Sequence, residues 1–176
     1  TVVRAADDAE SEAGIVIAGS EAVLAKFRWT SLNEAMTVNK VRFIVTETST
    51  AGVTSTLRAD EFASGNSVKL YADGLLLGSA PMTGEGNDAG TAIFDDLKWT
   101  IGKDLTKTLV VKGVMNTIAG GGDTGSNMYV TVTSTGFEAQ GQTAKDTTIT
   151  GAVGQEKVFM KTKPTISLVS LDSGAK

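Results

Sequence analysis

The chain has 176 residues, a formal net charge of -4 at pH 7 and a sequence pI near 4.9, and its length fits one domain with a sizeable core. The acidic balance excludes nucleic acid and anionic membranes as expected partners, because both require a basic face, and no apolar run approaches the ~20 residues of a membrane span. Cysteine and histidine are both absent, which excludes disulfides, zinc–thiolate sites and the commonest catalytic base. We therefore expect no metal, no cofactor and no enzymatic activity.

The composition and the spacing of apolar residues predict an all-β chain. Threonine occurs 24 times and proline only 2 times, and no long amphipathic helical pattern is present. Two runs, 22–30 and 37–48, alternate apolar and charged side chains as half-buried antiparallel strands do. Their apolar faces are predicted to carry Val23, Ala25, Phe27 and Trp29 in the first run and Val41, Phe43 and Val45 in the second. Shorter apolar runs lie at 1–6 and 14–19.

The strongest local signal is the dipeptide Asp73-Gly74, which lies between the strand-like runs 68–72 and 75–80. An Asp-Gly pair supplies the positive φ angles of a tight hairpin turn. The irregular stretch 49–67 is predicted to hold a loop or a helical turn near Phe62. Further strands are predicted at 91–94, 98–101, 107–114, 128–135 (an exposed one), 146–150 and 157–162. Roughly nine to eleven short strands at this spacing indicate a two-sheet β-sandwich.

The C-terminal segment has the pattern of one more strand. Pro164 separates it from the run 157–162, and it is apolar on both faces through Ile166, Leu168, Val169 and Leu171. No chain follows to pair with it, so its predicted partner is a neighbouring subunit. We divide the chain into an N-terminal strand with an acidic linker (1–14), a β-sandwich domain (15–163) and a C-terminal strand extension (164–176). The chain begins at Thr1 without Met, so we expect that an upstream segment was removed, as after cleavage of a secretory signal, or that the boundary is artificial.

The order of the segments also resembles a known group of domains. The runs 22–29, 38–43, 70–78, 94–101 and 108–112 together resemble Ig-like β-sandwich domains of bacterial and archaeal surface proteins, in which such domains are strung in tandem. The resemblance extends from about Ala22 to Leu171 and implies an Ig-like fold. In tandem arrays a segment like 163–171 leaves one domain and becomes the first strand of the next. The chain is thereby similar to subunits of extracellular filaments that assemble by donor-strand complementation.

This resemblance implies a pilin-like structural subunit of an extracellular, cell-surface appendage that serves adhesion or biofilm structure. Each subunit would lend a strand to the next, and such a head-to-tail contact propagates into a helical homopolymer. The expected polymerisation interface consists of Ile166, Leu168, Val169 and Leu171, with Val2 and Val3 as the weaker donor candidate at the other end.

An alternative function is a monomeric carbohydrate- or surface-binding β-sandwich module with a glycan or cell-surface target. Its binding surface would need exposed aromatic side chains. Trp29 is assigned to the core, whereas Trp99, beside Lys98, is the candidate for an exposed stacking residue, together with Tyr71 and Tyr129. A third alternative, a capsid-like sandwich, would form closed shells or tubes.

The acidic residues form two further candidate sites. Asp7, Asp8, Glu10 and Glu12 could bind calcium, but their spacing does not match a calcium loop, so we interpret them as a solvated linker. Asp95 and Asp96, with Glu85 and Asp88 nearby, could act as the paired carboxylates of a glycoside hydrolase. Adjacent residues on a strand point to opposite faces, which argues against that chemistry.

Overall fold

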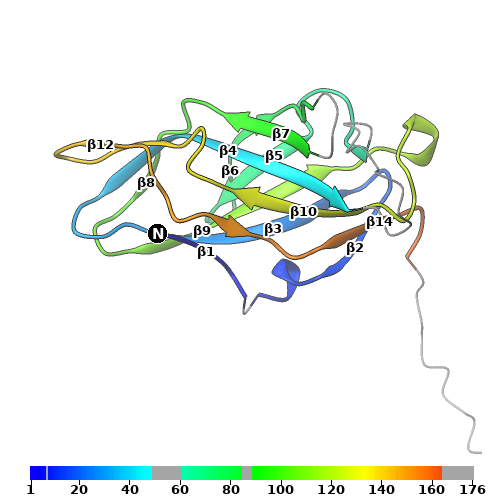
Figure 1. The fold of residues 1–176 in the computed structure, drawn as a ribbon, viewed down its shortest axis with the longest axis horizontal. Helices are drawn as coiled ribbons and strands as arrows, with labels where there is room; N and C mark the ends of the chain where they lie inside the picture. Colours follow the sequence, from blue (N-terminus) through cyan, green and yellow to red (C-terminus); the bar gives the residue numbers. More distant parts are fainter. Residues whose placement is uncertain (7, 49–60, 85–88, 164–176) are drawn as a thin grey trace, which may run out of the picture.

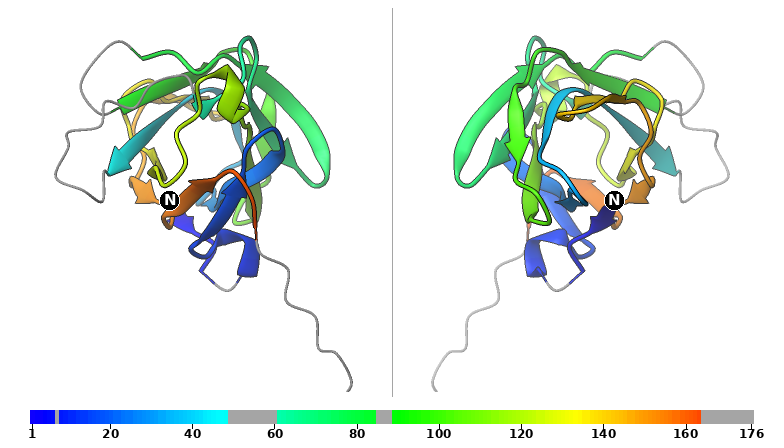
Figure 2. Two further views of the ribbon diagram at one scale, coloured as in Figure 1. Left: turned by 90° about the vertical axis from the view of Figure 1, so that its right-hand side faces the viewer. Right: turned by 90° about the vertical axis from the view of Figure 1, so that its left-hand side faces the viewer.

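Two β-sheets face each other in the computed structural model, which describes residues 1–6, 8–48, 61–84 and 89–163, and end-on views show the two layers (Figure 2). Apart from short 3₁₀ turns such as η1 (Ala9–Ser11) and η3 (Ile118–Gly120), the regular structure of these residues is β. The all-β, Ig-like two-sheet sandwich predicted from the sequence is confirmed, and its strands pair antiparallel except for Lys157–Met160, which pairs parallel with Gly14–Ile17. None of the helical turns in the described ranges has the length and apolar character needed to cross a bilayer.

The first sheet has five antiparallel strands in the order β1-β3-β9-β5-β6 (Figure 1). They are β1 (Val2–Arg4), β3 (Glu21–Thr30), β9 (Thr106–Val114), β5 (Val68–Ala72) and β6 (Leu75–Ala80). The second sheet has nine strands and runs β12-β11-β4-β10-β14-β2, with β13 beside β10 and both β7 and β8 beside β4. They are β2 (Gly14–Ile17), β4 (Met36–Thr48), β7 (Ala89–Phe94), β8 (Trp99–Ile101), β10 (Asn127–Val132), β11 (Glu138–Gln140), β12 (Lys145–Asp146), β13 (Ala152–Val153) and β14 (Lys157–Met160).

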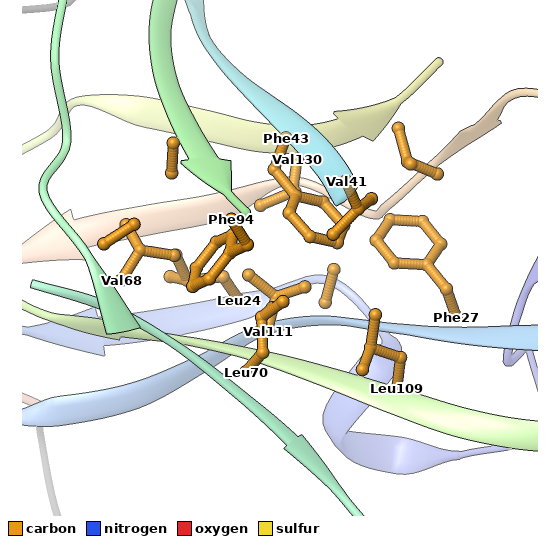
Figure 3. Close-up of a cluster of buried hydrophobic side chains, with 14 of the residues drawn as sticks. Leu24, Phe27, Val41, Phe43, Val68, Leu70, Phe94, Leu109, Val111 and Val130 are labelled. Atoms are coloured by element: carbon orange, nitrogen blue, oxygen red, sulfur yellow. The ribbon is translucent and has the colours of Figure 1, made fainter. Parts of the chain in front are cut away.

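The core lies between the sheets and is built from the faces that the alternation predicts. Phe27 on β3 stacks on Phe43 of β4 with ring centroids 6.0 Å apart, and Phe94 of β7 packs edge-on against Phe43 at 6.1 Å. Figure 3 shows these rings together with aliphatic side chains of the five-stranded sheet, among them Leu70 and Leu109. The assignments of Trp29, Val41 and Val45 to the core are also confirmed.

The prediction that Val23 faces the core is wrong, because β3 contains a bulge. The register between β3 and β9 shifts between Val23 and Ala25, so that Leu24 and Ala25 are both fully buried. Val23 is displaced to the outer face, where it lies near Lys26 and Tyr71. A bulge inserts one residue into a strand and thereby reverses the side-chain alternation beyond it.

The predicted hairpin is confirmed. β5 and β6 pair antiparallel and are joined by Asp73 and Gly74, whose φ angles are 52° and 78°. Two consecutive positive φ angles are the signature of the type I′ turn, whose twist matches that of the flanking strands. Asp73 also forms an ion pair with Lys107 on β9, with 3.3 Å between the charged atoms.

The strand predicted at 128–135 exists as β10, but the prediction that it is exposed is wrong. β10 lies between β4 on one side and β13 and β14 on the other, and its inward side chains Met128, Val130 and Val132 are buried.

The strand predicted at 146–150 is shorter in the structure, where β12 ends at Asp146. The described residues form fourteen strands, more than expected, because β11, β12 and β13 are pieces of two or three residues. Most of the stretch 49–67 lies outside the described residues.

Candidate binding cleft

A cleft of about 410 Å³ opens at one end of the sandwich, where the ends of β1, β3, β4 and β8 meet β11 and β12. It is lined by Thr1, Trp29, Thr30, Ser31, Leu32, Glu34, Met36, Val38, Ile101, Phe137, Ala139, Ala144, Lys145, Asp146, Thr148 and Ile149. The described chain ends near the opposite end of the molecule, after β14, as the labels β12 and β14 show in Figure 1. A volume of this size falls in the usual range of about 300–1,000 Å³ for small-molecule sites.

The floor of the cleft is formed by residues at the edge of the hydrophobic core. Trp29 contacts Trp99 edge-on with ring centroids 5.9 Å apart and Phe137 in a tilted arrangement at 5.8 Å. Val38 and Ile101, both buried, complete the apolar floor. Aromatic side chains arranged in this way supply a large apolar contact area at a fixed geometry.

The rim is held in place by hydrogen bonds between loops that are far apart in the sequence. The Glu34 carboxylate, in the β3–β4 connection, accepts from the backbone N–H of Gln142 at 2.7 Å and from the N–H and Oγ1 of Thr143 at 3.2 Å. Ser31 Oγ donates to the carbonyl oxygen of Glu34 at 2.6 Å. These bonds fasten the β3–β4 connection to the β11–β12 turn and keep the mouth of the cleft in one shape.

The charged groups of β11 and β12 are also paired. Lys145 Nζ lies 2.5 Å from Glu138 Oε2, and the hydrogen bond from Lys145 lowers the pKa of Glu138. The Asp146 carboxylate accepts from the N–H and Oγ1 of Thr148 at 2.8 and 2.9 Å. Glu34, Glu138 and Asp146 therefore serve the local structure, and within the described residues no cluster of acidic side chains could hold a metal ion.

One polar group of the cleft floor is unsatisfied. Trp29 is buried, and its indole Nε1 has no hydrogen-bond partner among the described residues. Buried tryptophan N–H groups usually find an acceptor, because an unmade hydrogen bond in the interior is costly. The Nε1 atom is itself buried, so the floor of the cleft offers an apolar surface, and the polar groups within reach of a ligand belong to the rim.

The residues predicted to form a polymerisation interface are only partly described. Val2 is buried in β1 opposite Trp29, and Val3 is half exposed opposite Arg28. Ile166, Leu168, Val169 and Leu171 lie outside the described residues. The strand predicted at 1–6 exists and belongs to the five-stranded sheet of its own chain. The role of the predicted residues in an interface between subunits stays a prediction.

The acidic N-terminal residues, which we interpreted as a solvated linker, keep partly exposed side chains but also form ion pairs with the sandwich. Lys26 Nζ lies 2.7 Å from Asp8 Oδ2 and 2.6 Å from Glu10 Oε2, and Arg4 pairs with Glu12 at 2.8 Å. Partial burial alone would lower the pKa of Lys26, but the hydrogen bonds to Asp8 and Glu10 outweigh it and raise the pKa above its ordinary value. Asp7 lies outside the described residues.

The four aromatic residues considered for sugar stacking do not form one platform. Trp99 is only 5% exposed and packs against Trp29, because the register of β8 on β4 turns its side chain into the core. Tyr71 lies on the outer face of the five-stranded sheet, with Lys112 Nζ 4.6 Å from its ring centroid, whereas Tyr129 belongs to β10 of the other sheet. Trp99 is therefore not the exposed stacking residue of the alternative function.

The carboxylates considered for glycoside hydrolysis do not face each other as a pair, because each described one binds a different lysine. Asp95 and Asp96 are exposed in the β7–β8 connection, where Asp95 pairs with Lys40 of β4 at 2.9 Å and Asp96 with Lys98 at 3.2 Å. Glu85 and Asp88 lie outside the described residues.

Sequence reasoning missed the cleft residues Leu32, Glu34 and Phe137, since they lie between predicted strands. An exposed leucine directly after a strand, at Leu32, was the available signal.

Comparisons with known proteins add little to this description. No protein family and no curated protein matches the chain. The solved structures that are similar to it in shape include the following two. One is a family 123 glycoside hydrolase from Clostridium perfringens, studied for glycolipid glycan hydrolysis, with a TM-score of 0.42 and 10% identity over 85% of this chain. The other is ACE19, the collagen-binding subdomain of the Enterococcus faecalis surface protein ACE, with a TM-score of 0.32 and 8% identity over 90% of this chain and 94% of that one.

The chain spans only 22% of the glycoside hydrolase. At these TM-scores neither likeness bears on what the present chain binds or catalyses.

Proposed function

We propose that the chain is a non-enzymatic, surface-binding β-sandwich module of an extracellular or cell-surface protein, and that it binds its target in the cleft at the end of the sandwich. The carrying observation is the cleft at the end of the sandwich, whose apolar floor around Trp29 is framed by a polar rim held in one shape by hydrogen bonds. A glycan fits this chemistry, because the face of a sugar ring is apolar and its edge carries hydroxyl acceptors. The carboxylates of the rim are engaged in structural hydrogen bonds, which agrees with binding without catalysis.

Tryptophan fluorescence tests this proposal directly. The chain has 2 tryptophans, and they contact each other beside the cleft, so a ligand in the cleft is expected to change the emission in a saturable way. The binding variant is Leu32→Asp, because Leu32 lines the cleft and is 60% exposed. The matched control is Leu75→Asp, because Leu75 is 70% exposed and does not line the cleft.

Both variants should fold, and a panel of glycans titrated against them should bind the control normally and the Leu32 variant weakly. Equal affinities for a bound glycan would place the site elsewhere. Failure of the whole panel to change the fluorescence, under conditions in which the chain binds cells or matrix, would remove the cleft from consideration.

Self-assembly is a second candidate function, supported by the path of the chain. Thr1 lies at the cleft, whereas Lys161, close to the last described residue, is hydrogen-bonded to Thr124 at the other end of the sandwich. Copies placed end to end therefore bring the last described residues of one close to the cleft end of the next. In this function the chain is a pilin-like subunit that assembles head to tail by donor-strand complementation.

Electron microscopy separates the two candidates, since self-assembly produces single-file fibres and a binding module stays monomeric. Deleting residues 165–176 should leave a folded monomer that forms no fibres. Undiminished polymerisation of the deletion variant would exclude Ile166, Leu168, Val169 and Leu171 as the interface.

A further inference from the structure

The outer face of the nine-stranded sheet is aliphatic, whereas the solvent face of a sheet in a sandwich is ordinarily polar. Inward side chains such as Phe43 of β4 and Phe159 of β14 are buried in the core, so the alternate residues of these strands point outward. In Figure 1 the strands β7, β4, β10 and β14 lie side by side in this layer. We call their outward surface the aliphatic face, and its main members are Ile15, Ile44, Ile93, Tyr129, Val153 and Val158.

The members of the aliphatic face are contiguous and accessible. Ile44 of β4 lies opposite Thr131 of β10, which in turn lies opposite Val153 of β13. Val158 of β14 lies opposite Ile15 of β2. Val153 is 53% exposed and Ile15 is 40% exposed. A contiguous apolar surface of this kind marks an interaction site on a soluble protein.

The outer face of the five-stranded sheet shows the ordinary polar arrangement. Lys69 and Lys112 project from it, and Glu21 forms ion pairs with both, at 2.6 and 3.4 Å. On the aliphatic face, the only charged side chain among the outward positions that the structure describes is Arg42. Arg42 lies at the margin of the face, where its guanidinium donates to Thr91 Oγ1 at 3.3 Å. The two outer surfaces of the sandwich therefore differ in chemistry.

The dimensions of the aliphatic face suit a small interface. From Ile93 to Met160 it extends over about eight positions along the strands, or roughly 27 Å at ~3.4 Å per residue. Across β7, β4, β10, β14 and β2 it measures roughly 19 Å at ~4.8 Å per neighbouring strand. Each copy thus offers on the order of 500 Å². A standard stable interface buries about 800 Å² per partner, so a contact through this face is weak and dissociates on dilution.

The chemistry of the aliphatic face favours a second copy of the chain as its partner. A partner with charged side chains would bury them against aliphatic groups without counter-ions, which is unfavourable. A second copy presents the same uncharged surface, because a two-fold contact brings identical patches together. The hydroxyl groups of Tyr129 and Thr131 can each donate and accept, so the same groups on two copies can hydrogen-bond to one another.

We propose that two copies of the chain pack their aliphatic faces against each other in a weak, closed two-fold pair, with Ile44 and Thr131 near its centre. The contact stacks sheet on sheet and requires no change of strand pairing in either copy. None of the members that define the aliphatic face lines the cleft. The pair therefore carries two clefts, and the inference holds whatever the cleft binds.

Analytical ultracentrifugation over protein concentrations from micromolar to millimolar tests the pair, and the chain should change from monomer to dimer over this range. Val153→Asp should raise the dissociation constant roughly tenfold or more, because a carboxylate from each copy enters an apolar contact. Ile93→Asp should act in the same direction from β7. The matched control is Leu76→Asp, which should leave the constant unchanged, since Leu76 is 54% exposed and lies on β6 of the other sheet.

Cysteine labelling locates the contact, since the chain has no native cysteine. The thiol of a Thr131→Cys chain should react more slowly as the protein concentration rises, because the pair covers it. A Thr108→Cys chain carries its cysteine on the outer face of the five-stranded sheet, opposite Arg28, and should react at a constant rate. Circular dichroism checks that each variant remains folded.

Three results would overturn the pair. The first is a chain that stays monomeric at every concentration. The second is a dimer that Val153→Asp and Ile93→Asp leave intact and that does not protect the cysteine at position 131. The third is a monomer that binds phosphatidylcholine vesicles and loses this binding in the Val153→Asp chain, which would assign the aliphatic face to a lipid surface.

Discussion

Lys157 is the most informative single residue for the stability of this sandwich. It lies on β14, its side chain is 6% exposed, and its Nζ donates to the carbonyl oxygens of Glu10, at 2.9 Å, and of Glu12. These two bonds attach the segment between β1 and β2 to the second sheet. The substitution Lys157→Met keeps the length and apolar stem of the side chain and removes both donors.

The expected cost can be worked out from these contacts. A hydrogen bond from a charged donor contributes about 1.5–3 kcal/mol, and the variant loses two of them. Part of the loss is offset because burying an ammonium group is itself unfavourable. We expect a net destabilisation of about 2 kcal/mol, which corresponds to a decrease in Tm of roughly 4–8 °C for a chain of this size.

Thermal and urea unfolding, followed by circular dichroism, measure the effect. The control is Lys103→Met, since Lys103 is exposed in the β8–β9 connection. If both variants lose the same amount of stability, Lys157 does not anchor the N-terminal segment and the reasoning is refuted.

The pH dependence gives an independent check. Burial lowers the pKa of Lys157 below its usual value of 10.5. The unfolded chain therefore binds this proton more tightly than the folded chain, and the Lys157 contribution to stability rises as the pH increases through the folded pKa toward 10.5. The stability difference between wild type and Lys157→Met should accordingly widen between neutral and alkaline pH, and a difference that narrows would contradict the burial of the charge.

Three other predictions follow from the fold. Gly74→Ala should lower the free energy of unfolding by about 1–2 kcal/mol in urea unfolding, because Gly74 has a φ of 78°, which an L side chain strains. The control is Gly14→Ala, because a Cβ added at Gly14 meets no atom closer than 3.7 Å. Phe27→Ala should cost about 3–5 kcal/mol through the cavity it leaves beside Phe43, and a loss below 1 kcal/mol would show that the two sheets repack. The hydrogen bond to Lys69 lowers the pKa of Glu21 below 4.5 in the folded chain. The contribution of Glu21 to stability is therefore complete above pH 4.5 and is lost as the pH falls through the folded pKa. The effect of Glu21→Gln on the free energy of urea unfolding should be smaller at pH 3 than at pH 7.

Local sequence signals predicted those parts of the fold that local physics determines. Asp73-Gly74 forms its turn because the two residues accept positive φ angles, and the alternation from Val41 to Val45 places one face of β4 in the core. The same local rule failed at Val23, because a bulge depends on how β3 meets β9 and leaves no mark in the alternation of a single strand.

The cleft could not be predicted because its parts are distant in the sequence. Glu34 binds the backbone of Gln142 and Thr143, more than a hundred residues away. Phe137 directly precedes β11, which pairs with β4 of one sheet, and its ring packs against Trp29 of the other sheet. A glutamate in a polar loop and a phenylalanine outside any predicted strand carry no sign of such contacts in a single sequence.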